Sequence, residues 1–239
     1  VHDDAEKIEH VLGESVVLFL ATEQLGTGSE TPVPTTLTAF DPKSGAERWR
    51  VTTLLTSVPI PPPVRVADDH VFVTGGYSSR STLLHIQRHA DGVASEEVFH
   101  IKKGSQLHPP VVHDGHIYLL ANENSNETPR RRHRGGLVCL DLTGEELWST
   151  GNDPYFGLGH MLQLGDYLLI QDGQSGILRM CHATPQGYLP VATANIFESE
   201  PKARKRMWAR MARSNTTLIV RGETELLCVR LGSRSGEVR

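Results

Sequence analysis

The feature that most constrains this chain is a five-fold repeat of an apolar segment, a tight polar turn and a second apolar segment. The repeated segments are residues 8–21, 64–74, 111–120, 161–171 and 209–221. We expect their turns at residues 13–14, 68–69, 114–115, 165–166 and 214–215. Repeats of hairpins roughly fifty residues apart are typical of propellers and related arrays, because one such unit cannot bury both of its faces alone.

A second hairpin follows each of these segments. In residues 36–49 and 137–148, an alternating strand runs to an Asp, a Ser/Thr-Gly turn follows, and a Trp stands four residues after the Gly. Glycine suits such a turn because it accepts a positive φ. Residues 83–99 and 177–191 are weaker copies, with Phe99 and Val191 in the place of the Trp.

These units predict an all-β fold. We expect four complete four-stranded antiparallel blades and three strands of a fifth, which together form a single β-propeller domain over residues 1–239. The expected blades are approximately residues 8–53, 58–103, 107–150, 155–198 and 207–232. A propeller protects its edge strands by closing into a ring, so about four and a half blades suggest part of a ring of about seven or eight. Alternatively, the last residues form a tail and a small ring closes imperfectly.

The second hairpins also carry a motif, Ala-x-Asp-x-x-Ser/Thr-Gly-x-x-x-Trp. It begins at Ala39 in the first unit, and the third unit is one residue shorter between the Asp and the Gly. The motif resembles the tryptophan-docking repeat of the pyrroloquinoline-quinone-like β-propellers. Residues 195–197, 207–209, 218–221 and 226–228 look most like the non-catalytic repeat proteins of this family, which are common in planctomycete-type bacteria. This resemblance implies that the Trp rings dock between neighbouring blades. It assigns a structural docking role to Asp41, Gly45, Trp49, Asp141, Gly144 and Trp148.

Charge and hydropathy exclude two broad classes. The chain has 24 Lys and Arg against 28 Asp and Glu, a net charge of -4. A general nucleic-acid binder would carry a basic excess, so we expect no nucleic-acid partner. No apolar run approaches the roughly 18 residues that a membrane helix needs, so we expect no membrane span.

The three cysteines, Cys139, Cys181 and Cys228, all fall in the third strand of their units. Corresponding positions on different blades should lie too far apart for a disulfide, which needs Cα atoms within about 7 Å. We therefore expect buried core residues with free thiols. The quinoprotein dehydrogenases of the resembled family carry a vicinal cysteine pair at the quinone, and this chain has none.

Two sets of residues are candidate ligand sites. His108, His160 and Trp208 stand where the inner strands of their blades begin, so they could face a central channel or serve only in packing. His113 and His116 flank the turn at residues 114–115 and form a weak candidate metal pair. The alternative for His113 and His116 is that they are ordinary exposed turn histidines.

Basic residues gather in two connecting segments, an insert at residues 122–136 and the connection before the fifth hairpin. They are Arg130, Arg131, Arg132, Arg134, Lys202, Arg204, Lys205 and Arg206. If both segments emerge on one face, they form a positive patch that could bind a protein partner, an anionic lipid or a phosphate. The alternative is a solvated loop.

The sequence thus favours a non-catalytic propeller scaffold, without a cofactor, that presents loops to a protein partner. The resemblance implies a periplasmic or otherwise extracytoplasmic location. The rival hypothesis is a fragment of a quinone-dependent dehydrogenase, with pyrroloquinoline quinone and a divalent cation in the channel. A third is a ligand-sensing propeller domain of a larger protein.

Overall fold

The computed structural model describes residues 9–22, 33–55, 59–76, 80–121, 136–197 and 206–232. All regular secondary structure in these ranges is β-strand. Within them, no helix has the length and apolar character needed to cross a bilayer.

The strands form five antiparallel sheets, each a meander of strands consecutive in sequence. The first contains β1 (Glu9–Val11), β2 (Glu14–Thr22), β3 (Val33–Phe40) and β4 (Glu47–Leu55). The second contains β5 (Val64–Ala67), β6 (His70–Val73), β7 (Ser81–His89) and β8 (Gly92–Ile101). The third contains β9 (Val111–His113), β10 (His116–Leu120), β11 (Leu137–Leu140) and β12 (Glu146–Ser149). The fourth contains β13 (His160–Leu164), β14 (Tyr167–Gln171), β15 (Leu178–His182) and β16 (Pro190–Ala194), and the fifth β17 (Ala212–Ser214), β18 (Thr217–Arg221) and β19 (Leu226–Arg230). The expected all-β organisation, with four four-stranded sheets and a fifth of three strands, is confirmed for the described residues.

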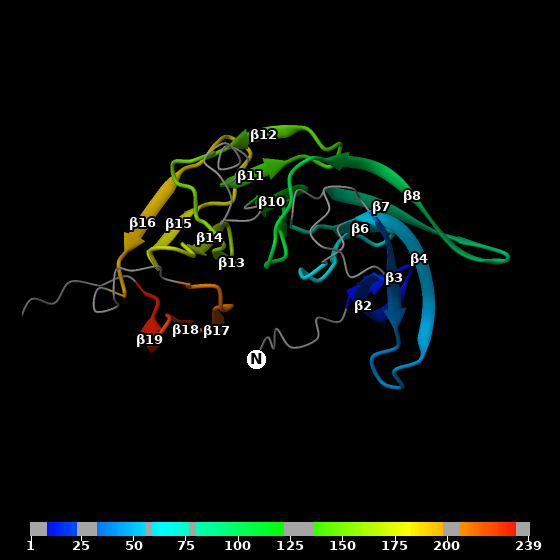
Figure 1. The fold of residues 1–239 in the computed structure, drawn as a ribbon, viewed down its shortest axis with the longest axis horizontal. Helices are drawn as coiled ribbons and strands as arrows, with labels where there is room; N and C mark the ends of the chain where they lie inside the picture. Colours follow the sequence, from blue (N-terminus) through cyan, green and yellow to red (C-terminus); the bar gives the residue numbers. More distant parts are fainter. Residues whose placement is uncertain are drawn as a thin grey trace, which may run out of the picture.

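The five sheets follow one another along an open arc (Figure 1). The first strand of each sheet lies on the inside of the arc and the last on the outside. The inner strands touch in sequence, because β1 contacts β5, β5 contacts β9, and β9 contacts β13. Each of the second, third and fourth sheets therefore packs one face against the sheet before it and the other against the sheet after it.

The hydrophobic core is divided among the four seams between neighbouring sheets. Alternation along the strands directs every second side chain into a seam, as in β4, where Trp49, Val51 and Leu55 are buried. Similar buried clusters join the second sheet to the third, the third to the fourth and the fourth to the fifth. Burying such side chains removes apolar surface from water at each seam, so every sheet is stabilised by its neighbours.

The outer faces of the first and fifth sheets expose large apolar side chains. Phe19 is 58% and Leu54 46% exposed on the side of the first sheet that faces away from the second. Ile219 is 44% and Leu226 70% exposed on the corresponding side of the fifth sheet. Among the described residues, no further sheet covers these two faces.

Three of the five expected hairpin turns lie where the sequence predicts them, and two predictions were one residue off. The first turn is Leu12-Gly13, because both residues adopt a positive φ, 55° and 74°, as a two-residue hairpin of type I′ requires. The last is Asn215-Thr216, with Asn215 at φ 52°. A one-residue slip exchanges the two faces of a strand, so this placement decides which side chains enter the core.

A break in strand register recurs between the third and fourth strands of the first four sheets. It falls immediately after Ala39, Leu83, Cys139 and Met180. The residues that pair with these four are Trp49, Phe99, Trp148 and Ala192. Phe99 thus takes the Trp position as expected, whereas the prediction for Val191 was wrong: Ala192 takes that position and Val191 is 47% exposed.

All three cysteines are free, as expected. Cys139 is buried in the seam toward the fourth sheet, but Cys181 stands one position later relative to the break and faces back into the same seam. The prediction that Cys228 is buried was wrong, because it is exposed. It pairs with Ile219 on the outer face of the fifth sheet, which has no neighbour among the described residues.

Candidate functional site

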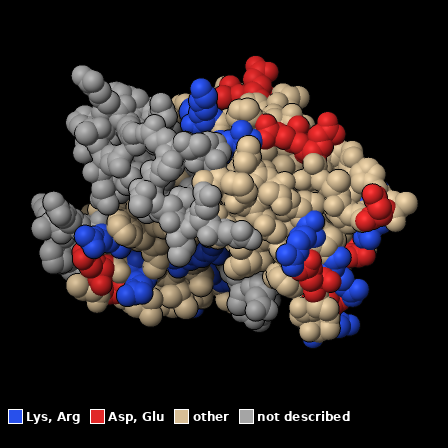
Figure 2. Space-filling model, turned by 45° about the vertical axis from the view of Figure 1, so that its right-hand side comes forward, with Lys and Arg blue, Asp and Glu red and all other residues tan. Residues whose placement is uncertain are grey.

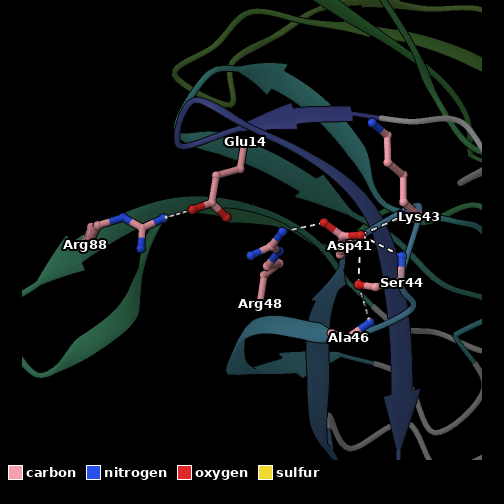
Figure 3. Close-up of polar contacts among 7 residues, drawn as sticks. All are labelled: Glu14, Asp41, Lys43, Ser44, Ala46, Arg48 and Arg88. Atoms are coloured by element: carbon pink, nitrogen blue, oxygen red, sulfur yellow. Dashed lines mark hydrogen bonds and ion pairs between the residues drawn. The ribbon is translucent and has the colours of Figure 1, made fainter.

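Asp41 organises the turn between β3 and β4. Its Oδ1 accepts the backbone N–H groups of Lys43, at 3.0 Å, and Ser44, at 2.7 Å, and also the Ser44 hydroxyl at 2.9 Å. Its Oδ2 pairs with Arg48. The Ser44 N–H, then Arg48, hold the pKa of this carboxyl well below its usual range. Figure 3 shows these partners converging on the carboxylate.

Asp141 organises the turn between β11 and β12 in a similar way. Its Oδ1 accepts the N–H groups of Thr143 and Glu145, both at 2.9 Å, and the Thr143 hydroxyl at 2.7 Å. Gly144 has a φ of 88°, and a Cβ there would lie 2.5 Å from Cδ2 of Phe99 in the second sheet. The turn is therefore also a contact between two sheets.

Sequence reasoning missed a third turn of this kind, at Asp172. Its Oδ1 accepts the N–H groups of Gln174, at 2.9 Å, and Ser175, at 2.7 Å, and Gly176 follows at φ 72°. The signal was present, because residues 41–45 and 172–176 both read Asp-x-x-Ser-Gly. This turn joins β14 to β15, at the opposite end of its sheet from the turns of Asp41 and Asp141.

The two motif tryptophans lie in seams between sheets. Trp49 is 5% exposed and packs in the first seam. Trp148 is partly buried in the third seam, where its indole N–H donates to the Thr184 carbonyl of the fourth sheet at 3.0 Å. The Tyr118 ring lies 6.3 Å from it, centroid to centroid.

Polar contacts join the first two sheets at the end that carries the hairpin turns. The N–H of Leu12 donates to the Asp68 carbonyl at 2.7 Å, turn to turn. Glu14 pairs with Arg88 of the second sheet at 2.9 Å, and Figure 3 shows Arg48 between Glu14 and Asp41. At the third seam, His113 of one turn region similarly meets Asp166 of the next, at 3.3 Å.

His108 and His160, two of the three channel candidates, are brought together on the inner side of the arc. Each is 4% exposed, and their ring centroids lie 4.6 Å apart at an angle of 51°. The Met211 N–H donates to Nδ1 of His160 at 2.7 Å. The backbone of Trp208 lies near the His108 ring and favours its protonated form.

Burial keeps this histidine pair uncharged. Together with a smaller effect of the nearby Arg210 cation, it lowers the pKa of His108 to about 4. Burial also lowers the pKa of His160, with added repulsion from His108 and Arg210. Trp208, the third candidate, is half-buried instead, with the Arg206 guanidinium 5.6 Å from its ring. The pair thus forms a packed polar contact, with no open space shown between the two rings.

His113 and His116 pair across the tip of their hairpin but do not share a ligand position. Nδ1 of His113 accepts from the Gln163 amide at 2.8 Å, in the fourth sheet. Nδ1 of His116 donates to the Asp114 carbonyl at 2.6 Å. The two imidazoles are committed to different partners.

Most of the basic candidates lie outside the described residues. These are Arg130, Arg131, Arg132, Arg134, Lys202, Arg204 and Lys205. Arg206 is described and exposed. Two segments hold these residues, one between β10 and β11 and one between β16 and β17. The flanking strands meet both segments at the end of the meanders opposite the turns between the first and second strands. On the face drawn in Figure 2, basic and acidic side chains are interspersed.

Comparison with known proteins assigns no family to this chain. No family model matches the chain, and no curated protein matches it.

Proposed function

We propose that this protein is a β-propeller scaffold of the pyrroloquinoline-quinone-like repeat type that binds an acidic protein partner through its basic connecting segments. The observation that carries the proposal is the contrast between the two ends of the sheets. At one end, short turns are tied to each other, as Leu12 is to Asp68 and His113 to Asp166. The long basic connections leave from the other end.

The stacking of the sheets supports the propeller part of the proposal. Consecutive meanders pack through aromatic residues at a repeated position, Trp49, Phe99 and Trp148. The exposed apolar faces around Phe19 and Ile219 are what blades need when another blade covers them. We propose that further sheets, from a longer chain or a second chain, complete the ring. The extracytoplasmic location stays a prediction from the resemblance.

Charge supports the choice of partner. The whole chain is slightly acidic, with a net charge of -4, yet four arginines stand within residues 130–134. A compact basic segment attracts an acidic surface and accelerates encounter with it. Guanidinium groups pair in a bidentate manner with carboxylates, which favours an acidic protein segment.

The described residues do not fit the rival quinone hypothesis. The three cysteines are separate along the chain, and no two of them form the vicinal pair that the resembled dehydrogenases carry. The histidine pair on the inner side is closely packed and buried. A flat quinone would need an open site between such groups. Addition of the quinone with Ca²⁺ to the full chain should therefore leave the quinone's absorbance spectrum unchanged.

The scaffold proposal is tested by changing charge at the proposed binding end. The variant R130Q/R131Q/R132Q/R134Q should retain the circular dichroism spectrum and Tm of the wild type. Its binding to immobilised polyglutamate, used as a probe of acidic polypeptide, should fall by at least ten-fold at low salt. The matched control R50Q/R213Q/R221Q/R230Q removes the same charge from described strands and should bind almost as the wild type does.

Three results would contradict the proposal. They are equal losses in both variants, no polyglutamate binding by the wild type, or preferential binding of phosphatidylserine vesicles or of inorganic phosphate. Preferential binding of vesicles would assign the segment to a lipid surface, and preferential binding of phosphate would assign it to a small anion.

A further inference from the structure

We propose that Asp69, His70 and His85 form a binding site for a divalent transition-metal ion of the zinc class, at the hairpin end of the second sheet. Each offers one ligand atom, and these three atoms lie within 4.8 Å of one another. They form the one group of three possible ligands in the part of the chain that the structure describes.

The backbone brings the three residues together. His70 begins β6 and His85 lies directly opposite it in β7, so their side chains project from one face of the sheet. Asp69 is the second residue of the preceding turn, and its carbonyl accepts the Ile86 N–H at 2.7 Å. This bond fixes the turn against β7. The backbone of the three residues is therefore already ordered before an ion binds.

The ligand atoms converge on the carboxylate. Nδ1 of His70 lies 2.6 Å from Oδ1 of Asp69, and Nε2 of His85 lies 3.1 Å from Oδ2. The two imidazoles are stacked, with centroids 4.7 Å apart and planes at 7°. Ligand atoms around tetrahedral Zn²⁺ are about 3.3 Å apart, so small side-chain rotations would suffice to admit an ion.

The donor set selects the class of metal. Two imidazole nitrogens and one carboxylate oxygen suit zinc, and by the general affinity order also nickel and copper, better than they suit calcium or magnesium. The side chains are about a quarter to a half exposed: 28% for His70, 29% for His85 and 45% for Asp69. An ion can therefore enter from solvent and complete its coordination with water.

Gln87 supplies the outer support that a metal-binding histidine normally has. Its amide lies 2.9 Å from Nδ1 of His85, the ring nitrogen that does not face Asp69. With the ion bound at Nε2, the Nδ1 proton would be accepted by the amide oxygen after a simple flip of the amide. Such partners orient the ring and raise its affinity for metal.

The positions of His70 and His85 in the sheet also support a binding role. On β6 and β7 they continue the side-chain stripes of Phe72 and Leu83, which are 0% and 2% exposed in the second seam. Apolar residues at these two positions would extend the second seam. Instead, two imidazoles and a carboxylate form a polar cluster at its end. An ion at this point would fix β6, β7 and the turn at Asp69 to one another.

Titration calorimetry of the full chain with Zn²⁺ alone tests the proposal, with Co²⁺ absorption as a second readout. We expect one site with a Kd in the micromolar range or tighter and a Co²⁺ spectrum with visible bands. H70Q/H85Q should weaken this site by at least a hundred-fold, and Gln87→Leu by about 10–100-fold. The control H113Q/H116Q removes the histidine pair at the next hairpin and should leave the site unchanged.

Folding of each variant is checked by its Tm without metal. A Zn²⁺-dependent rise in Tm should occur in the wild type and the control but not in H70Q/H85Q. The proposal is overturned if the wild type does not bind Zn²⁺, or if H70Q/H85Q binds as the wild type does. It is also overturned if the control loses the site equally. If H70Q/H85Q does not fold, Gln87→Leu decides, since an unchanged Kd would contradict the proposal.

Discussion

The imidazoles of His108 and His160 pack against each other, 4.6 Å between centroids, although they belong to the segments that begin two different sheets. Both are 4% exposed and uncharged near neutral pH, because burial holds the pKa of each below its usual range. The contact joins the third and fourth sheets on the inner side of the arc. It makes the stability of the protein sensitive to acid.

We expect the free energy of unfolding to fall as pH falls from about 6.5 to about 4. The pKa of His108 is about 4 in the folded protein and near 6.5 when the chain unfolds, so the unfolded state binds more protons in this window. His108→Leu should give a shallower pH dependence, measured by urea unfolding at several pH values. An identical dependence in the variant would show that other groups cause the effect.

Trp49→Ala should lower the free energy of unfolding by about 3–5 kcal/mol, because it empties a large volume in the first seam. Trp49 is 5% exposed there. Trp208→Ala, at a half-buried position, should cost clearly less. Urea denaturation monitored by circular dichroism measures both. Equal losses would mean that Trp49 has no special part in holding the sheets together.

Gly144→Ala should destabilise the protein more than Gly45→Ala. Both glycines have positive φ, 88° and 71°, so each alanine carries backbone strain of about 1–2 kcal/mol. Only at Gly144 would the new Cβ also meet Phe99, at 2.5 Å, whereas nothing lies within 4 Å at Gly45. Shortening Phe99 to Leu should recover part of the additional loss. A double-mutant cycle in urea measures this coupling, and a coupling near zero would refute it.

One of the three cysteines should react rapidly with a thiol reagent in the native protein. Cys228 is exposed, whereas Cys139 and Cys181 are buried, and burial raises the pKa of Cys139 to about 11 and of Cys181 to about 12. Cys228→Ser should abolish the rapid phase, with the other two reacting only on unfolding. In a longer or assembled form whose next sheet covers Ile219, the rapid phase should disappear from the unmodified protein. Rapid labelling there would contradict the proposed extension of the ring.

Some of the candidate sites are determined by residues adjacent in sequence, and others by the pairing of distant residues. The turns at Asp41 and Asp141 follow from a few adjacent residues, because an Asp side chain bonds N–H groups two to four positions later. The turn at Asp172 carries the same local signal but joins the second and third strands of its sheet. By contrast, His70 and His85 are fifteen residues apart, and only the cross-strand register of β6 and β7 makes them neighbours.

The sequence by itself determined the strands, their grouping into four sheets of four and one of three, and the aromatic position occupied by Trp49 and Trp148. Period-two alternation and turn-forming residues act over short distances, so no knowledge of packing is needed to recognise them. The tertiary structure decided whether each face of a sheet contacts a neighbouring sheet or solvent. Cys139 precedes the register break of its sheet and Cys181 follows the break of the next, and both are buried in the same seam, whereas the absence of a described neighbour leaves Cys228 exposed. Sheet faces alternate with each residue, so these outcomes depend on how strands and sheets meet in space.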